Sequence, residues 1–265
     1  MSIKVKRYIK NKLFSIFRHR GYFIEKSSQK NLWDDPFTAQ KELLKDYTQP
    51  EPIIFDVGAS IGNTVRAYLK LSPPAIIYCF EPYPASIAKL KNRFSSKKQV
   101  RIVPYAVAEK SGEKIFYVNH FEPTNSLLPR PDESRRYYPR HAGPKNTITV
   151  RTLSLDDFAK DSGIEYVDVL KLDVQGGELM ALQGSEKLLQ ARAIGLIYSE
   201  IIFIAHYKGG PLFHHLCSFL DSYDYSLFNI YGLKTAANGQ LRFGNAIFVS
   251  SDLRKKIIDQ HPEEI

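Results

Sequence analysis

The segment that most constrains the fold is a buried strand followed by an acid and a glycine turn, at residues 53–63. Its first three residues are large and apolar, as in a strand buried within a parallel sheet, and the residues after the turn suit a helix. Gly58 and Gly62 allow positive φ and a close approach of a ligand to the backbone, and the helix N-terminus offers free N–H groups. Asp56 adds a carboxylate at the end of the strand. The segment therefore predicts a ligand site built from a strand, a loop and a helix.

Two further acids follow apolar strands in the same way. The glycine turn at residues 58–62 is not the G-x-G-x-x-G of dinucleotide-binding proteins, because Ser60 replaces the middle glycine. Glu81 follows the next predicted strand, near the spacing at which an acid meets ribose hydroxyls in doubly wound folds. Asp173 follows a later apolar strand and precedes another glycine-rich turn. Because parallel strands end at one edge of a sheet, we expect Asp56, Glu81 and Asp173 to lie together at that edge.

The alternation of strand and helix patterns predicts one α/β domain at residues 51–252, preceded by an arm and cap at 1–50 and followed by a tail at 253–265. A hairpin is expected within residues 105–118. The stretch at about 120–147 has no clean periodicity and contains five prolines. A stretch of this length in a compact domain is either a lid over the site or a solvated loop, and its aromatic and basic residues favour a lid.

The net charge of +9 is concentrated at the N-terminus, because residues 1–20 hold seven basic residues and no acid. Their apolar residues recur at helical spacing, so this segment predicts a basic amphipathic helix. It would lie on an anionic membrane surface, or else pack on its own domain or on a partner chain. No apolar run approaches the roughly 20 residues that span a bilayer, and no secretory signal is evident. We expect a cytoplasmic protein, with peripheral attachment to the inner face of the membrane as an alternative.

Seven short motifs occur along the chain in a fixed order, and together they are far more specific than any one of them. They are I-F-D-V-G-A-S-I-G-N, C-F-E-P-Y-P, A-V-A-E-K-S-G, T-N-S-L-L, T-L-S-L-D-D-F, L-K-L-D-V-Q-G-G-E and Y-S-E-I. On these motifs the sequence resembles the FkbM-type methyltransferases, which depend on S-adenosylmethionine (SAM), over roughly residues 50–250. The resemblance implies a three-layer α/β/α, Rossmann-like class I methyltransferase sheet, mostly parallel with one antiparallel strand near the C-terminus.

The chain departs from the family pattern at two positions. Ser60 stands where the family usually has Asn, and Gln175 stands where it usually has Glu. The second change argues against a metal or catalytic-base role at Gln175 and leaves the cofactor loop undisturbed. By resemblance, the glycine turn lines the methionine end of SAM, Glu81 holds the ribose, and Tyr83 with residues 106–107 flanks the adenine. The predicted cofactor-binding residues are Asp56, Gly58, Ala59, Ser60, Gly62, Asn63, Glu81, Pro82, Tyr83, Ala106, Val107 and Asp173.

Transfer of a methyl group to a hydroxyl also requires a base to remove the proton, or a metal to polarise the oxygen. Asp173 is the first candidate for the base, and Glu200 is the second, since both are expected to end adjacent strands at the pocket; His206 is the third. Asp173 could instead orient the amine of SAM or a loop. Lys171, unusual within an apolar strand, is expected to pair with Asp173 or Glu200 or to extend to the sheet edge. No dense spacing of metal ligands occurs, so we predict a metal-independent reaction.

The acceptor is the least constrained part of the prediction. The family typically methylates hydroxyls on sugars, glycans or natural products, so we expect O-methylation of a carbohydrate, glycan or related natural product. The basic cluster Arg130–Arg140 would receive an anionic sugar or phosphate, or else is solvated. Two alternatives are a non-catalytic assembly module of a glycan-biosynthesis complex and a nucleic-acid methyltransferase. The latter is disfavoured because the domain outside the arm is only mildly charged, and the oligomeric state is left open.

Overall fold

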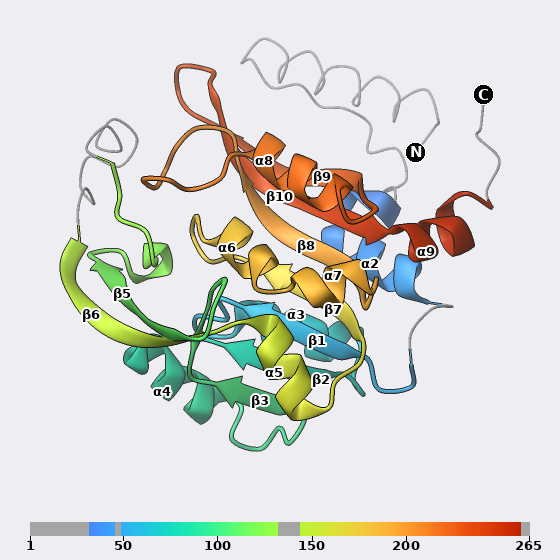
Figure 1. Cartoon of the computed structure of the whole chain (residues 1–265), viewed down its shortest axis with the longest axis horizontal. Helices are drawn as coiled ribbons and strands as arrows, with labels where there is room; N and C mark the ends of the chain where they lie inside the picture. Colours follow the sequence, from blue (N-terminus) through green and yellow to red (C-terminus); the bar gives the residue numbers. More distant parts are fainter. Residues whose placement is uncertain (1–31, 46–48, 132–143, 261–265) are drawn as a thin grey trace, which may run out of the picture. The chain divides into compact units, whose positions relative to one another are not determined.

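The computed structural model describes residues 32–45, 49–131 and 144–260 (Figure 1). The chain divides into a unit at Met1–Asp34, of which only the short helix η1 (Leu32–Asp34) is described, and a larger unit at Asp35–Ile265. The basic helix predicted for residues 1–20 lies outside the described residues, as does residue His141 of the predicted lid.

The larger unit is built on a seven-stranded sheet with the strand order β3-β2-β1-β7-β8-β10-β9. β10 runs antiparallel to both of its neighbours, and the other pairings are parallel (Figure 1). The predicted fold class is therefore confirmed. The strands are β1 (Ile53–Val57), β2 (Ile76–Phe80), β3 (Val100–Val103), β7 (Val167–Leu172), β8 (Ile194–Ile202), β9 (Tyr225–Thr235) and β10 (Leu241–Ser250).

A second sheet of three strands comprises β4 (Ala106–Val107), β5 (Gly112–Asn119) and β6 (Pro144–Leu153). β6 lies in the middle, antiparallel to β5 and parallel to β4. The hairpin predicted for residues 105–118 is therefore wrong, because β4 and β5 both pair with a strand that comes much later in the chain. Local alternation identified the strands but contained no information about their partner.

Helices cover both faces of the main sheet, with α5, α6 and α7 in front of it in Figure 1 and α3 and α4 behind it. α2 belongs to the larger unit, because the Phe37 ring packs on Tyr68 of α3 and on Tyr198 of β8. The helices are α2 (Pro36–Leu44), α3 (Asn63–Leu71), α4 (Pro84–Arg93), η2 (Glu122–Thr124), α5 (Leu155–Ser162), α6 (Glu178–Gln183), α7 (Glu186–Gln190), α8 (Phe213–Asp221), α9 (Ser251–Leu253) and η4 (Arg254–Ile258).

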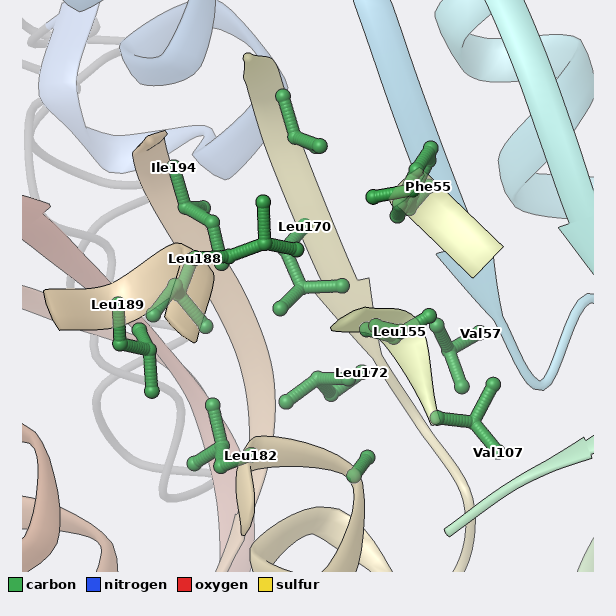
Figure 2. Packing of buried hydrophobic residues seen from close by; sticks show 14 of the residues in the cluster. Phe55, Val57, Val107, Leu155, Leu170, Leu172, Leu182, Leu188, Leu189 and Ile194 are labelled. Atoms are coloured by element: carbon green, nitrogen blue, oxygen red, sulfur yellow. The ribbon is translucent and has the colours of Figure 1, made fainter. Parts of the chain in front are cut away.

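The largest hydrophobic cluster lies between the sheet and the helices α5–α8. Figure 2 shows Leu155 of α5 and Leu182 of α6 packed beside Leu170 and Leu172 of β7. All four side chains are buried, and burying a side chain of this size stabilises the fold by about 1.5–3 kcal/mol. Side chains from the sheet and from the helices thus hold β7 in place, and the residues that follow β7 line the cavity described below.

The strand order determines where the ligand site lies. β1 pairs with β2 on one side and with β7 on the other, so the connections that follow β1 and β7 leave the sheet in opposite directions. Open α/β sheets bind their ligands at such a reversal, outside the carboxyl ends of the strands. The turn at 58–62 and the turn at 173–177 both begin at this point.

Glu200 differs from its predicted position. The sequence suggested that it ends its strand, but β8 continues to Ile202, and Glu200 pairs with Asn245 of β10. An acid inside a strand that is otherwise buried was read as the end of the strand. It is tolerated here because polar groups of the site surround it.

Candidate active site

A cavity of ≈ 370 Å³ opens at the carboxyl ends of β1, β2 and β7. Of the residues predicted to bind a cofactor, Gly58, Ala59, Ser60, Asn63, Glu81, Pro82, Ala106, Val107 and Asp173 line it. Further lining residues that were not predicted to bind the cofactor include Lys89, Tyr105, Glu122, Asn125, Leu127 and Gln175. The three carboxyl ends and the wall from the small sheet therefore enclose one space.

The turn after β1 is packed tightly against the turn after β7. Gly58 has φ +78°, and a Cβ at this position would lie 1.9 Å from the backbone oxygen of Asp173. Its N–H donates to the carbonyl of Phe80 at 3.0 Å. Gly58 thus has the positive φ that the sequence predicted, but the space that it leaves is filled by protein backbone.

Glu81 organises the wall formed by β2. One carboxylate oxygen accepts the N–H of Ser60 at 2.8 Å, and the other accepts the N–H of Tyr83 at 2.9 Å. Burial raises the pKa of Glu81, and these two N–H groups oppose that shift. Each oxygen retains lone pairs that can accept from a ligand hydroxyl.

Asp56 and Lys171 form a buried ion pair at the cavity floor, which Lys171 lines. They sit opposite each other in the pairing of β1 with β7, and the Nζ of Lys171 lies 2.9 Å from Asp56 Oδ1 and 3.9 Å from Asp173 Oδ2. Burial by itself would lower the pKa of Lys171, but the charges of Asp56 and Asp173 raise it to about 12. Burial raises the pKa of Asp56, against the attraction of Lys171. Asp56 is fully buried and does not line the cavity.

Two other predicted cofactor residues also lie outside the lining. Gly62 has φ +80° at the start of α3, and a Cβ there would meet the Phe94 ring at 2.3 Å. Tyr83 contributes its N–H to Glu81, and its ring packs on the hydrophobic cluster of the small sheet around Phe116. Both residues support the walls of the cavity from behind.

Asp173 belongs to a hydrogen-bonded cluster that extends away from the cavity toward β8. The side-chain amide nitrogen of Gln175 donates to Asp173 Oδ1 at 2.8 Å and to Glu200 Oε2 at 3.0 Å. The amide oxygen of Gln175 accepts from the Tyr207 hydroxyl at 2.8 Å. The Asp173 side chain is 44% exposed, so it contacts both the cavity and this cluster.

The other two candidate bases lie farther from the cavity and do not line it. Burial, together with Asp173 and Glu178, raises the pKa of Glu200 well above its usual range. The buried His206 ring lies 5.8 Å from the Phe243 ring, and burial together with Arg242 and Arg130 lowers its pKa to about 4. Of the three candidates, Asp173 alone faces the cavity.

Sequence reasoning missed Gln175 as a link between carboxylates and missed Tyr207 altogether. The signal for Gln175 was available, since it lies two residues after Asp173 in a glycine turn, but an amide in place of an acid was read as a lost function. Lys171 was recognised as unusual, and it does approach Asp173, but its nearest carboxylate is Asp56. A charge of opposite sign at the same level of two buried neighbouring strands would have predicted that pair.

Within the described ranges, no group of three or more His, Cys, Asp or Glu side chains is arranged to hold a metal ion. None of the helices described in residues 32–260 is long and apolar enough to cross a membrane.

Comparison with known proteins identifies the family. The profile of the Methyltransferase FkbM domain matches residues 56–227, which begin in β1 and end in β9. This chain belongs to the FkbM methyltransferase family. The match includes the glycine turn, Glu81, Asp173 and Glu200, and every residue that lines the cavity described above lies within it.

Two relatives of this FkbM domain are methyltransferases by name. The 2-O-methyltransferase NoeI of Sinorhizobium fredii is 28% identical over 169 residues, which are 60% of this chain and 68% of NoeI. The hexuronic acid methyltransferase AglP of Haloferax volcanii is 24% identical over 151 residues, which are 56% of this chain and 56% of AglP. The alignment with AglP thus spans little more than half of that protein.

Among solved structures, the FkbM domain resembles an rRNA methylase from Streptococcus thermophilus, with a TM-score of 0.43 and 12% identity over 82% of this chain and 96% of that one. It also resembles the magnesium protoporphyrin IX methyltransferase ChlM from Synechocystis with bound SAM. The TM-score there is 0.44, with 10% identity over 86% of this chain and 87% of ChlM.

As a member of this family the chain is a SAM-dependent methyltransferase. The residues around the cavity fit this cofactor. Glu81 offers carboxylate oxygens to ribose hydroxyls, Ala106 and Val107 present an apolar wall for a base, and Asp173 presents a carboxylate suited to an amine. The cavity volume of ≈ 370 Å³ falls within the range of small-molecule sites, about 300–1,000 Å³.

Proposed function

We propose that this enzyme transfers the methyl group of SAM to a hydroxyl of a carbohydrate, glycan or related natural product, with Asp173 as the general base. The observation that carries the proposal is the position of Asp173, which lines the cofactor cavity on one side and joins the polar cluster of Gln175 and Glu200 on the other. A hydroxyl held there would meet the cofactor and the base at the same time. The name of NoeI, a 2-O-methyltransferase, supports transfer to an oxygen, and that of AglP, a hexuronic acid methyltransferase, supports a sugar acceptor.

When bound, SAM supplies an electrophilic methyl group on a sulfonium. The new bond forms between the acceptor oxygen and the methyl carbon as the carbon–sulfur bond breaks, and the sulfur keeps the electron pair of that bond. The acceptor proton passes to the Asp173 carboxylate, so the charges balance. The Nζ of Lys171 lies 3.9 Å from that carboxylate. An aligned in-line displacement requires mainly orientation and exclusion of water.

The segment after β5 supports the exclusion of water. Glu122 and Leu127 line the cavity, and Glu122 pairs with Lys89 of α4 at 3.0 Å across its mouth. Ser126 ties the same segment to the backbone oxygen of Gln175 at 2.7 Å. We propose that residues 120–131 form part of the lid that was predicted at about 120–147; residues 144–147 of that stretch belong to β6 instead.

The test is incubation of the enzyme with methyl-labelled SAM and fractionated cell-envelope glycans, followed by mass spectrometry of the labelled products. We expect label on a sugar oxygen. Asp173→Asn should lower kcat/KM by about 10²–10⁴-fold, while Asp161→Asn, on an exposed carboxylate of α5, should leave it unchanged. Label on RNA with none on glycans would overturn the acceptor class, and an Asp173→Asn enzyme with full activity would overturn the base.

A further inference from the structure

The side-chain amide of Gln175 is the centre of the polar cluster between β7 and β8. Its nitrogen lies 2.8 Å from an oxygen of Asp173 and 3.0 Å from an oxygen of Glu200. Its oxygen lies 2.8 Å from the hydroxyl of Tyr207. Both N–H groups and the oxygen of the amide are therefore engaged at once.

The orientation of this amide follows from its neighbours. An ionised carboxylate oxygen can only accept hydrogen bonds, and the donor nitrogen of Gln175 opposes the rise in the pKa of Glu200 that burial causes. Turning the amide over would bring its oxygen against both carboxylates and the nitrogen against the hydroxyl. The amide nitrogen thus occupies the position between two carboxylates that a cation takes in many proteins.

The backbone holds the amide in this position. Gln175 has φ +57°, which is uncommon for a residue with a side chain. Its carbonyl accepts the Ser126 hydroxyl at 2.7 Å. On either side, the buried Glu178 carboxylate accepts the N–H of Val174 at 3.0 Å and that of Gly176 at 3.3 Å. The backbone of the turn is therefore fixed at three successive residues, and the amide itself is held by its bonds to Asp173, Glu200 and Tyr207.

We propose that Gln175 is a positioning residue whose amide holds Asp173 and Glu200 together in place of a divalent cation, so that the proposed base acts without a metal. The inference deepens the proposed function and rests on its assignment of Asp173. An isosteric acid at 175 would replace the donor nitrogen by a third carboxylate oxygen directed at the other two. Three carboxylates converging on one point form a hard-cation site of the kind that Mg²⁺ and Mn²⁺ occupy.

The test is the variant Gln175→Glu, titrated with Mn²⁺ by calorimetry next to the wild-type enzyme. We expect the variant to bind Mn²⁺ at least about tenfold more tightly than the wild type, and the added change Glu200→Gln to remove that gain. Binding of S-adenosylhomocysteine within about threefold of wild type shows that the variant is folded. A folded variant that gains no Mn²⁺ affinity overturns the proposal. Mn²⁺ binding by the wild type that is lost in Asp173→Asn also overturns it.

A second variant keeps the proposal testable if Gln175→Glu does not fold. Gln175→Met has a similar shape and no donor, so it releases both carboxylates. We expect kcat to fall at least about tenfold, with binding of S-adenosylhomocysteine and the unfolding temperature unchanged. A merely structural role would lower all three quantities together, and that result would overturn the proposal. The Mn²⁺ titration needs no acceptor, so it stands even if the acceptor class proposed above is wrong.

Discussion

The buried pair of Asp56 and Lys171 provides the sharpest test of the charges beneath the cavity. The Asp56 side chain is 0% exposed and that of Lys171 is 5% exposed, with 2.9 Å between their charged groups. Lys171→Met keeps most of the aliphatic stem and removes the ammonium. It leaves a carboxyl that either carries an uncompensated charge or takes up a proton. Loss of one partner of a buried pair typically costs about 3–5 kcal/mol.

The free energy of keeping Asp56 protonated sets the upper limit of the stability that Lys171→Met loses. A carboxyl with an ordinary pKa of 3.8 needs about 1.4 kcal/mol per pH unit to stay protonated above that value, which is about 5 kcal/mol at pH 7.4 and about 1.6 kcal/mol at pH 5.0. Burial already raises the pKa of Asp56, and removal of Lys171 raises it further. The folded variant therefore binds more protons than the unfolded chain, so its stability falls as pH rises above about 3.8.

The assay is urea unfolding followed by far-ultraviolet circular dichroism at both pH values. The matched control is the double variant Asp56→Asn with Lys171→Met, which has no carboxyl to protonate. We expect the double variant to exceed Lys171→Met in free energy of unfolding by up to about 5 kcal/mol at pH 7.4 and by about 1.6 kcal/mol at pH 5.0. An equal difference at both pH values would refute the reasoning, because it would mean that the folded variant holds no more protons at Asp56 than the unfolded chain does.

Three further predictions concern the walls of the cavity. Gly58→Ala should abolish binding of S-adenosylhomocysteine in calorimetry, because its Cβ would meet the Asp173 backbone. The control Gly209→Ala, at a glycine with φ +72° and nothing within 4 Å of an added Cβ, should cost only about 1 kcal/mol of stability. Glu81→Ala should weaken that binding by about 10–100-fold, and equal affinity would remove Glu81 from the cofactor site. Burial raises the pKa of Glu178 to about 7, so this carboxyl should contribute a fall in stability of about 1.4 kcal/mol per unit from pH 4.5 to 7, and Glu178→Gln should remove that contribution in urea unfolding.

The parts of the fold that the sequence predicted well depend on local patterns. The apolar run of β1, the acid after it and the two glycines determine a strand and a left-handed turn whatever the rest of the chain does, and both glycines have the expected positive φ. The start of the helix α5 is likewise fixed locally, since Ser154 accepts the N–H of Asp157 at 3.1 Å. Local backbone preferences and capping bonds decide these features within a few residues.

The features that sequence reasoning missed depend on which strand lies beside which. β4 pairs with β6, about 45 residues later, rather than with β5, because the choice of partner is made by burial and by the length of the intervening chain. Glu200 was placed at the end of β8, but its partner Asn245 on β10 extends the strand by two residues. No motif or periodicity in the sequence marks Tyr207 as part of the site. Its hydroxyl reaches Gln175 only because the chain after β8 returns toward the turn at 173–177.

The two basic or neutral donors that contact Asp173 should have separable effects on the reaction. Lys171 also donates to the carbonyl of Gly58 at 3.1 Å, so it joins the glycine turn to the floor of the cavity, and its loss should weaken cofactor binding and catalysis together. Gln175 contacts Asp173 from the side of Glu200, away from the glycine turn, so its loss should lower kcat and spare the cofactor. Comparing the Kd for S-adenosylhomocysteine with kcat in Lys171→Met and Gln175→Met measures this difference. Equal losses of cofactor affinity in the two variants would mean that the cavity and the polar cluster act as one unit, and would contradict the separate roles argued above.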